Sequence, residues 1–471
     1  MTVLTKEVVK AAMTCLAPEV LWRLMELHDS VSLCLMESRV RQKTLARHGQ
    51  EQGLARHGQE QGLARHGQEQ GLARHGQEQG LGQGEPQCWP LLPTPQCSSP
   101  LDEHSLLHAS WNGCLEQVRT LLICGVKADS RDTQGWTPLH HVSFRGHLPL
   151  VKLLLQSGQV EVNCRDFFNC TPLHRSCWAG HNEIAHYLLQ RGASPVMRSS
   201  SGQTPLHLAA ANGHSATARL LLQQGALLEA QDFHRWTPLH WAAIGGWGEV
   251  SDLLLDNGAD VEGGKGGGAS PLQLAVWAGS EESVKLLLHR GASANTAGPS
   301  GRTALHLCAC TGDTKILKQL LAGGALVDVT DGSLASPLHL AARSGSREVV
   351  QLLILSGTPL EKRDRLLMTP LHCAALGDNE DTARLLLHYG AEVDATERLG
   401  RTPLHLAAER GHCKVLTVLL ERGADSMLRT QWLETAKDIA QEHGQLRVLQ
   451  IIQEHQTTPK INRKNTIQTE L

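Results

Sequence analysis

The tetrapeptide Thr137-Pro138-Leu139-His140 decides the fold of this sequence, because it returns along the chain at a nearly constant interval. Identical copies begin at Thr171, Thr204, Thr237, Thr369 and Thr402, and looser copies begin at Ser270, Thr303 and Ser336. The copy at Ser270 ends in Gln273 instead of histidine. The last position of the motif advances by 33 residues at every step except the first, which is 34. A fixed period of this length predicts a solenoid built from one repeated unit.

Each unit carries the signals of two short helices. Thr137 is a good N-cap, and Pro138 suits the first helical position, where its missing N–H costs nothing. Gly146 can end that helix in the left-handed conformation, and Gly158 can end a second helix that contains Leu153, Leu154 and Leu155. Two helices of this size cannot bury an apolar face alone, so each unit needs neighbours on both sides.

These residues resemble the ankyrin repeat, whose signature is the Thr-Pro-Leu-His opening followed by Ala-Ala, Gly-His and a leucine-rich second helix. The resemblance covers about residues 101–455. It implies an all-α ankyrin-repeat solenoid of about eleven helix-turn-helix units. The first unit has Leu107 and the last has Asp438 at the histidine position. Such divergent end units are typical of a solenoid, because its outermost faces meet water.

The flanks of the array differ from it in composition. Residues 1–44 are predicted to form a helical N-terminal segment. Residues 45–100 contain a nine-residue repeat, Leu-Ala-Arg-His-Gly-Gln-Glu-Gln-Gly, followed by a proline-rich linker. We expect this low-complexity stretch to be a disordered spacer, because it holds too few apolar residues to build a core. Residues 456–471 form a polar C-terminal tail.

Composition favours a soluble intracellular protein. The 471 residues carry a net charge of −3 and 19% charged side chains, so nothing indicates a nucleic-acid partner. No run of 18 apolar residues occurs, and the N-terminus lacks the core of a signal peptide, so we expect no membrane association. The 13 scattered cysteines predict reduced thiols in the cytoplasm or also the nucleus. We expect a monomer.

The residues that could carry chemistry are explained by the repeat, so we expect no catalytic residues, no cofactor and no metal. Eight of the 26 histidines occupy the motif position, which is structural in ankyrin repeats. Cys164, Cys170, His174 and Cys177 lie close in sequence but match no paired zinc spacing. The glycine-rich stretch at 263–268 lacks the Ser or Thr that a phosphate-binding loop needs after its lysine.

Twelve of the 16 aromatic residues fall between Trp111 and Trp277. In the ankyrin fold, the position four after the histidine faces the concave groove, as do the finger residues before each threonine. This predicts a protein-binding surface of Trp111, Trp136, Phe144, Phe167, Phe168, Trp178, Phe233, Trp236, Ile244 and Trp277. Exposed aromatic residues in adjacent repeats are typical of protein interfaces. The alternative is that these rings pack between units or against the N-terminal helix.

Two short motifs add further hypotheses. Thr469, Glu470 and Leu471 resemble a ligand for PDZ domains, which bind a free carboxylate and an apolar last side chain. The context of Asn163, with Leu155 upstream, resembles that of asparagines hydroxylated in some ankyrin proteins.

The leading functional hypothesis is a non-enzymatic adaptor or scaffold that binds a protein partner through the aromatic N-terminal half of its groove. The alternative is a structural spacer that links the N-terminal helix to a PDZ-type partner. An enzyme is disfavoured, because neither flank has room for a catalytic domain. We also expect the array to be least protected from hydrogen exchange at Gln273, which loses a histidine link, and at Asp378, which replaces a helix-ending glycine.

Overall fold

The computed structural model describes residues 103–264 and 268–457, which belong to one compact unit, Leu101–Leu471. The predictions for residues 1–44 and 45–100, and for Thr469, Glu470 and Leu471, lie outside the described residues. The last helix of the array ends at Thr457, two residues beyond the expected boundary at 455.

All regular structure in the described residues is helical, in eleven pairs that we number as units 1 to 11. The first helices are α3 (Glu103–Asn112), α5 (Pro138–Arg145), α7 (Pro172–Ala179), α9 (Pro205–Ala211), α11 (Pro238–Gly245), α13 (Pro271–Ala278), α15 (Ala304–Thr311), α17 (Pro337–Ser344), α19 (Pro370–Gly377), α21 (Pro403–Arg410) and α23 (Ala436–Glu442). The second helices are α4 (Leu115–Ile123), α6 (Leu148–Gln156), α8 (Asn182–Gln190), α10 (Ser215–Gln223), α12 (Gly248–Asp256), α14 (Glu281–His289), α16 (Thr314–Ala322), α18 (Arg347–Leu355), α20 (Glu380–His388), α22 (Cys413–Glu421) and α24 (Leu446–Thr457). The all-α solenoid of about eleven units is confirmed.

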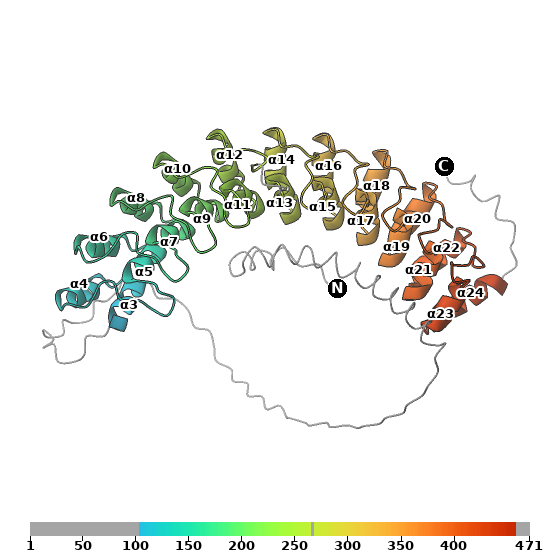
Figure 1. Ribbon diagram of the computed structural model, residues 1–471, viewed down its shortest axis with the longest axis horizontal. Helices are drawn as coiled ribbons and strands as arrows, with labels where there is room; N and C mark the ends of the chain where they lie inside the picture. The colour runs from blue at the N-terminus through green and yellow to red at the C-terminus, as the bar shows by residue number, and fades with distance from the viewer. Residues whose placement is uncertain (1–102, 265–267, 458–471) are drawn as a thin grey trace, which may run out of the picture. The chain divides into compact units, whose positions relative to one another are not determined.

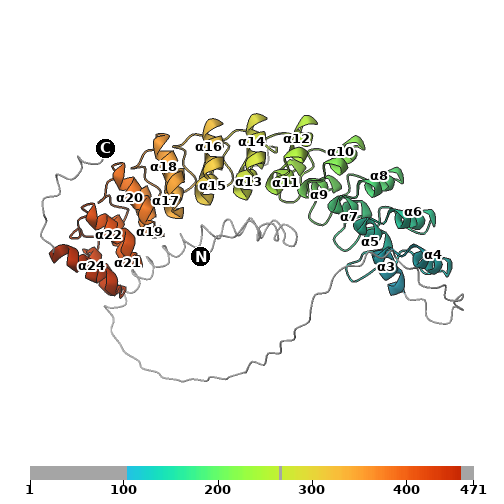
Figure 2. The same cartoon turned by 180° about the vertical axis from the view of Figure 1, so that it is seen from behind.

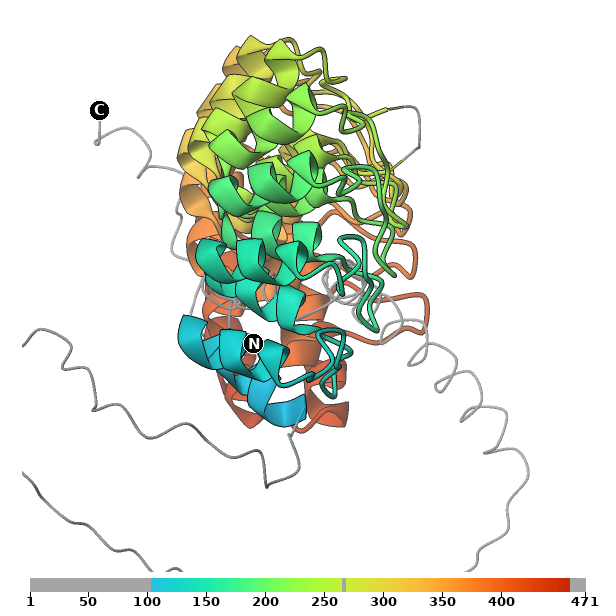
Figure 3. The same cartoon turned by 90° about the vertical axis from the view of Figure 1, so that its left-hand side faces the viewer.

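The units stack side by side along an arc. The first helices α3 to α23 line the inner side of the arc and the second helices lie outside them (Figures 1 and 2). We call the loop between the second helix of one unit and the first helix of the next a finger. Seen from one end, the fingers all project from the same side of the stack (Figure 3). The inner helices and the fingers therefore form one continuous surface.

The motif histidine ties each unit to the next. In unit 2, Nδ1 of His140 accepts from the backbone N–H of Thr137 at 3.2 Å and from its hydroxyl at 2.9 Å. The other ring nitrogen, Nε2, lies 3.0 Å from the carbonyl oxygen of Cys170, in the finger that precedes unit 3. A carbonyl only accepts, so Nε2 carries the proton and the ring is neutral. The same cross-unit bond is made by His174, His207, His240, His306, His339, His372 and His405.

Gln273 keeps this link, which corrects the expectation that unit 6 loses it. Its Oε1 accepts from the backbone N–H of Ser270 at 3.0 Å. Its Nε2 donates to the carbonyl oxygens of Thr296 and Arg302 at 2.9 and 2.8 Å. An amide presents an acceptor and a donor at its two ends, as a neutral imidazole does, so glutamine satisfies the same groups.

At six of the ten junctions a second link runs in the opposite direction, next to the residue that ends the inner helix. Gly146 has a φ of +88°, and a Cβ added there would lie 2.7 Å from Cε1 of His181 in the next unit. Nε2 of His181 lies 3.0 Å from the carbonyl oxygen of Phe144. The missing side chain of the glycine thus leaves room for a residue that bonds back to the preceding unit. The corresponding bonds elsewhere are made by His147, His214, Trp247, Asn379 and His412.

Asp378 disturbs this arrangement in unit 9. It ends α19 in the left-handed conformation with a φ of +55°, and its Cβ takes the place that glycine leaves open in other units. His412 of the next unit bonds through Nδ1, not Nε2, to the carbonyl oxygen of Ala375 at 2.8 Å. Ala375 lies one position earlier in its repeat than Phe144, the acceptor of His181. The link survives, but with a different geometry.

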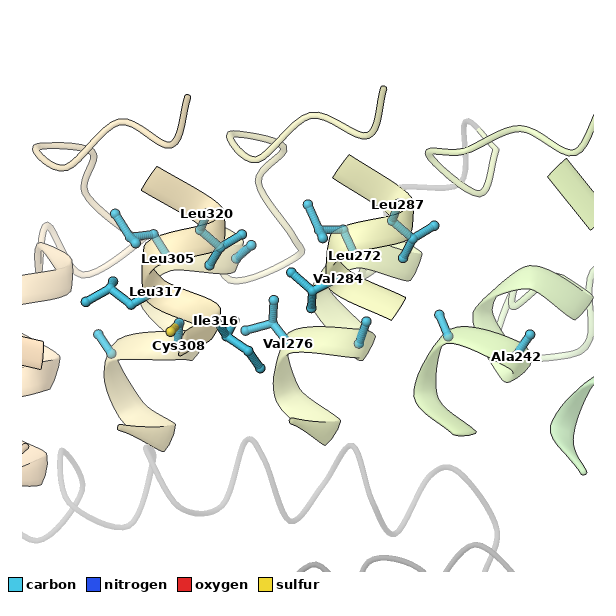
Figure 4. Close-up of a cluster of buried hydrophobic side chains, with 14 of the residues drawn as sticks. Ala242, Leu272, Val276, Val284, Leu287, Leu305, Cys308, Ile316, Leu317 and Leu320 are labelled. Carbon is cyan, nitrogen blue, oxygen red and sulfur yellow. The ribbon is translucent and has the colours of Figure 1, made fainter. Parts of the chain in front are cut away.

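Between the units lies a continuous apolar core. Val276 of α13 and Ile316 of α16 point toward one another across the junction of units 6 and 7, and both are fully buried (Figure 4). Leu287 and Leu320 occupy equivalent buried positions on the outer helices α14 and α16. Because each junction repeats this packing, every unit completes the core of its neighbour.

We predict that Asp378→Gly stabilises the array by about 1 kcal/mol, because a residue with a Cβ is disfavoured in the left-handed conformation and glycine is not. The measurement is hydrogen exchange across units 8 to 10, where the protection of the α19 and α22 amides should rise. The matched control is Gly345→Asp in unit 8, which should lower protection at the next junction. Equal protection in the wild type and in Asp378→Gly would contradict the prediction.

We also predict that the array loses stability as the pH falls from about 6.5 to about 4. Burial lowers the pKa of His306 from its ordinary value of 6.5 to about 4. Between these values the unfolded chain binds a proton that the folded unit excludes, so acid favours unfolding, and stability is fully present only above about pH 6.5. The protection factor of the Thr303 amide should therefore fall over this range in the wild type. In His306→Gln it should fall less, because a glutamine makes the same bonds at position 273 without titrating, while buried histidines such as His339 in the next unit still titrate. An equal fall in both proteins would refute the assignment.

Candidate protein-binding surface

A cluster of aromatic rings lies on the inner helices of units 1 and 2. Trp111 of α3 and Phe144 of α5 are stacked, with ring centroids 6.2 Å apart. Trp136, from the finger between them, meets Phe144 edge-on at 5.5 Å. The guanidinium of Arg145 lies 4.8 Å from the ring centroid of Trp111. The rings support each other and leave apolar area at the surface, since Trp111 is 37% exposed.

Two largely buried polar pairs contact this cluster. Nε2 of His141 lies 3.0 Å from Oδ2 of Asp132. Arg175, one unit further on, pairs with Asp166, and its guanidinium lies 4.3 Å from the ring centroid of Trp136. Burial lowers the pKa of His141, and the nearby Asp132 opposes this effect. The rings therefore rest on side chains that are fixed by hydrogen bonds.

The aspartates also shape the fingers. Oδ1 of Asp166 accepts from the backbone N–H groups of Phe168 and Cys170 at 2.9 and 2.8 Å. Its other oxygen, Oδ2, accepts from Arg175 at the position nine residues later. Asp232 uses its Oδ2 in the same way, to accept from Nε1 of Trp241 at 3.0 Å.

His141, Arg175 and Trp241 were not predicted from the sequence, although a signal for them was present. Most other units have leucine at this position of the repeat: Leu208, Leu274, Leu307, Leu340 and Leu406. A polar or indole side chain in a position that normally holds leucine indicates a specific partner, which here is the finger aspartate. Arg145 was missed because nothing in the period marks it.

The predicted binding residues differ in their exposure. Phe167, Phe168 and Phe233 are at least half exposed at the finger tips. Trp136, Phe144, Trp178 and Trp277 are half-buried on the fingers and inner helices. A Cβ on Gly135 would lie 2.7 Å from Cδ1 of Phe167, so this ring lies on the glycine of the preceding finger with its other side open to solvent. Phe233 lies in the same way on Gly202.

Trp236 and Ile244 are buried, which corrects the expectation that they face the groove. The ring of Trp236 stacks on His240 at 6.4 Å and meets Trp241 at 5.2 Å. Ile244 lies on α11, which packs between α9 and α13. For these two residues the alternative of packing within the array is therefore correct.

The cysteines near His174 are buried thiols. Burial raises the pKa of Cys170 to about 11, and it also raises the pKa of Cys164 and Cys177. A thiol that keeps its proton is a poor metal ligand and a poor nucleophile. Within residues 103–264 and 268–457, no group of three His, Cys, Asp or Glu side chains is placed to hold a metal ion.

No helix of these same residues is long and apolar enough to span a bilayer.

Asn163 is held by the next unit. Its Nδ2 donates to the carbonyl oxygen of Gly192 at 3.2 Å, and its Oδ1 accepts from the backbone N–H of Ser194 at 3.0 Å. Hydroxylation of Asn163 stays a prediction, and an enzyme acting on it has to reach a side chain that is bonded at both ends.

Comparisons with known proteins are consistent with this geometry. The family model described as "Ankyrin repeats (3 copies)" matches residues 106–199, 206–297, 272–364 and 338–430. A second model, "Ankyrin repeats (many copies)", matches residues 179–222. The comparison with curated proteins gave no match.

We predict that Asp166→Ala destabilises the finger before unit 3 by about 3 kcal/mol, because it removes two backbone hydrogen bonds and leaves a buried charge unpaired. The side chain of Arg175 is only 12% exposed. The double variant Asp166→Ala/Arg175→Leu should recover much of this loss, since leucine is the common residue at that position. The measurement is hydrogen exchange at the amides of Phe168 and Cys170, together with a thermal melt. If the double variant is no more stable than the single one, the ion pair does not support the finger.

Proposed function

The chain belongs to the ankyrin-repeat family, whose arrays generally mediate protein–protein interactions, and we propose that it is a non-enzymatic adaptor that binds a protein partner through the N-terminal half of its inner surface. The site consists of the ring cluster of Trp111, Trp136 and Phe144 together with the exposed finger residues Phe167, Phe168 and Phe233. Trp178 and Trp277 extend it along the inner helices. We propose that the protein is cytoplasmic, or both cytoplasmic and nuclear, and that its oligomeric state is a monomer.

The observation that carries this proposal is the exposure of aromatic rings on neighbouring fingers. Phe167 and Phe233 are 66% and 71% exposed, and each lies on the glycine of the preceding finger. Exposed rings of this size gain little from folding, whereas they gain a great deal from burial by a partner. Because the fingers are already ordered by aspartate caps, a partner does not have to order them on binding.

The charge beside the rings gives the chemistry of the partner. Arg145 is exposed, lies over Trp111 and forms no ion pair with any described residue. Arg175 is already paired with Asp166 and is largely buried, so it is not available. The partner should therefore present large apolar side chains with a carboxylate nearby, placed to meet Arg145.

We predict that Phe167→Ser/Phe168→Ser/Phe233→Ser lowers the affinity for the partner at least about tenfold, because aromatic side chains at the centre of an interface contribute most of its energy. The test is affinity capture from cells with quantitative mass spectrometry, followed by titration of each partner that is lost. A second variant, Trp111→Ser/Phe144→Ser/Trp178→Ser/Trp277→Ser, should lose the same partners.

The matched control is Ile123→Ser/Leu355→Ser/Leu446→Ser, which changes three exposed apolar residues on the outer helices α4, α18 and α24. It should keep all partners, and circular-dichroism melts must show that each variant folds. If both aromatic variants keep the full set of partners, the adaptor proposal fails. The spacer that binds a PDZ domain through Thr469, Glu470 and Leu471 then becomes the better hypothesis, and Leu471→Ala tests it directly.

A further inference from the structure

A second set of exposed apolar residues lies at the finger tips of the C-terminal units. In nine of the fingers that the structure describes, the third residue after the start of the finger turn has a left-handed backbone. Gly135, Gly202, Gly301 and Gly400 occupy this position in four fingers. Leucine occupies it in the fingers before units 8, 9 and 11, where Leu334, Leu367 and Leu433 have φ values of +62°, +63° and +61°.

These leucines are unfavourable for the fold in two respects. A left-handed backbone is disfavoured for any residue with a Cβ, and glycine fills the same position in four other fingers, with Asn169 and Arg235 in two more. The three side chains also stay in water, since the residues are 50%, 45% and 68% exposed. Backbone strain together with apolar exposure is typical of residues that serve a binding function.

The tips are joined into one row. The backbone N–H of Arg365 donates to the carbonyl oxygen of Ser333 at 2.8 Å, and that of Arg398 donates to Leu366 at 2.9 Å. Gln431 bonds in the same way to Leu399 at 3.1 Å. Leu366, Leu399 and Trp432, at or next to these bonds, are half-buried apolar residues. We call the set the leucine tip row; it comprises Leu334, Leu366, Leu367, Leu399, Trp432 and Leu433.

Positive charge is interspersed with these leucines. Arg365 and Arg398 are exposed, and neither guanidinium forms a hydrogen bond or ion pair with the residues that the structure describes. Three acidic residues begin the turns that carry these tips: Asp331 is buried beside Arg302, Glu397 is buried beside Arg401 at 2.8 Å, and Asp364 is half-buried, with its Oδ1 accepting from the backbone N–H groups of Leu366 and Met368. The exposed charged side chains next to Leu366 and Leu399 at the tips, Arg365 and Arg398, are thus positive.

We propose that the leucine tip row is a second binding surface, for a protein segment in which acidic residues alternate with large apolar ones. Carboxylates of the segment pair with Arg365 and Arg398, and its apolar side chains cover Leu334, Leu367 and Leu433. The surface uses none of the residues of the aromatic site, so the two can be occupied and tested independently.

The test begins with a phage-displayed library of random linear peptides, selected on the full chain. Enriched peptides should be rich in Asp and Glu together with Leu, Phe or Trp, and they are then synthesised and titrated by fluorescence anisotropy. Leu334→Gly/Leu367→Gly/Leu433→Gly should weaken binding at least about tenfold. Its melting temperature should be equal to or above that of the wild type, because glycine suits the tip backbone, so lost binding cannot be attributed to misfolding.

Charge reversal gives an independent readout. The variant Arg365→Glu/Arg398→Glu should lower the affinity of the chain for the same peptides. It should also remove the salt dependence of this affinity, because exposed ion pairs are screened by salt. The matched control is Phe167→Ser/Phe168→Ser/Phe233→Ser, which should bind these peptides as tightly as the wild type.

Three results would overturn the proposal. The first is that no selected peptide loses affinity when the three leucines are changed to glycine. The second is that vesicles of phosphatidylcholine and phosphatidylserine, and not peptides, bind to the wild type and lose binding to the leucine variant. This result would make the occupant a membrane. The third is self-association of the wild type in sedimentation that disappears in the leucine variant, which would make the occupant a second copy of the chain.

Discussion

Eight of the ten junctions in this array depend on a buried neutral imidazole that is hydrogen-bonded through both ring nitrogens. In His140, one nitrogen completes the cap of its own helix and the other reaches the next finger. At six junctions a residue just after the inner helix makes the return link, as His181 does to Phe144. Together these bonds satisfy polar groups that would otherwise be buried without partners, and they set the spacing at which the apolar faces meet. Packing supplies the energy of the junction, and the histidine supplies its geometry.

Because the repeated residues have these structural roles, the residues that determine function are those that differ from unit to unit. The repeated residues form the helix caps, the links between units and the apolar core. The residues at the finger tips and on the exposed face of the inner helices are therefore free to vary. The finger aspartates show how the two sets of residues meet. Asp166 shapes its finger with one oxygen and with the other fixes Arg175, on which the ring of Trp136 lies. A surface feature is thereby anchored to a residue that the fold already requires.

Most of the architecture was predictable from the sequence, because period, caps and glycines act locally. The predicted loss of a link at Gln273 was wrong. The prediction considered only that glutamine is not histidine, whereas both side chains offer one acceptor and one donor at the same places. The exposure of Trp236 and Ile244 was also predicted wrongly. Whether a ring on a finger points outward or inward depends on the residues that surround it in space. Trp236 turns inward because Trp241 offers it a ring to pack against, and period alone does not reveal that contact. The strained backbone of Leu334 is likewise visible only in the structure.

The direction of the histidine link has a consequence for how the chain is made. The acceptor of His140 is the carbonyl oxygen of Cys170, 30 residues later, and most other units show a separation of 29. During translation the donor therefore leaves the ribosome well before its acceptor. In each of the eight units with a motif histidine, the imidazole of the newest unit is still hydrated, and the unit is completed only when its successor emerges. Assembly of the array thus follows synthesis with a delay of one unit.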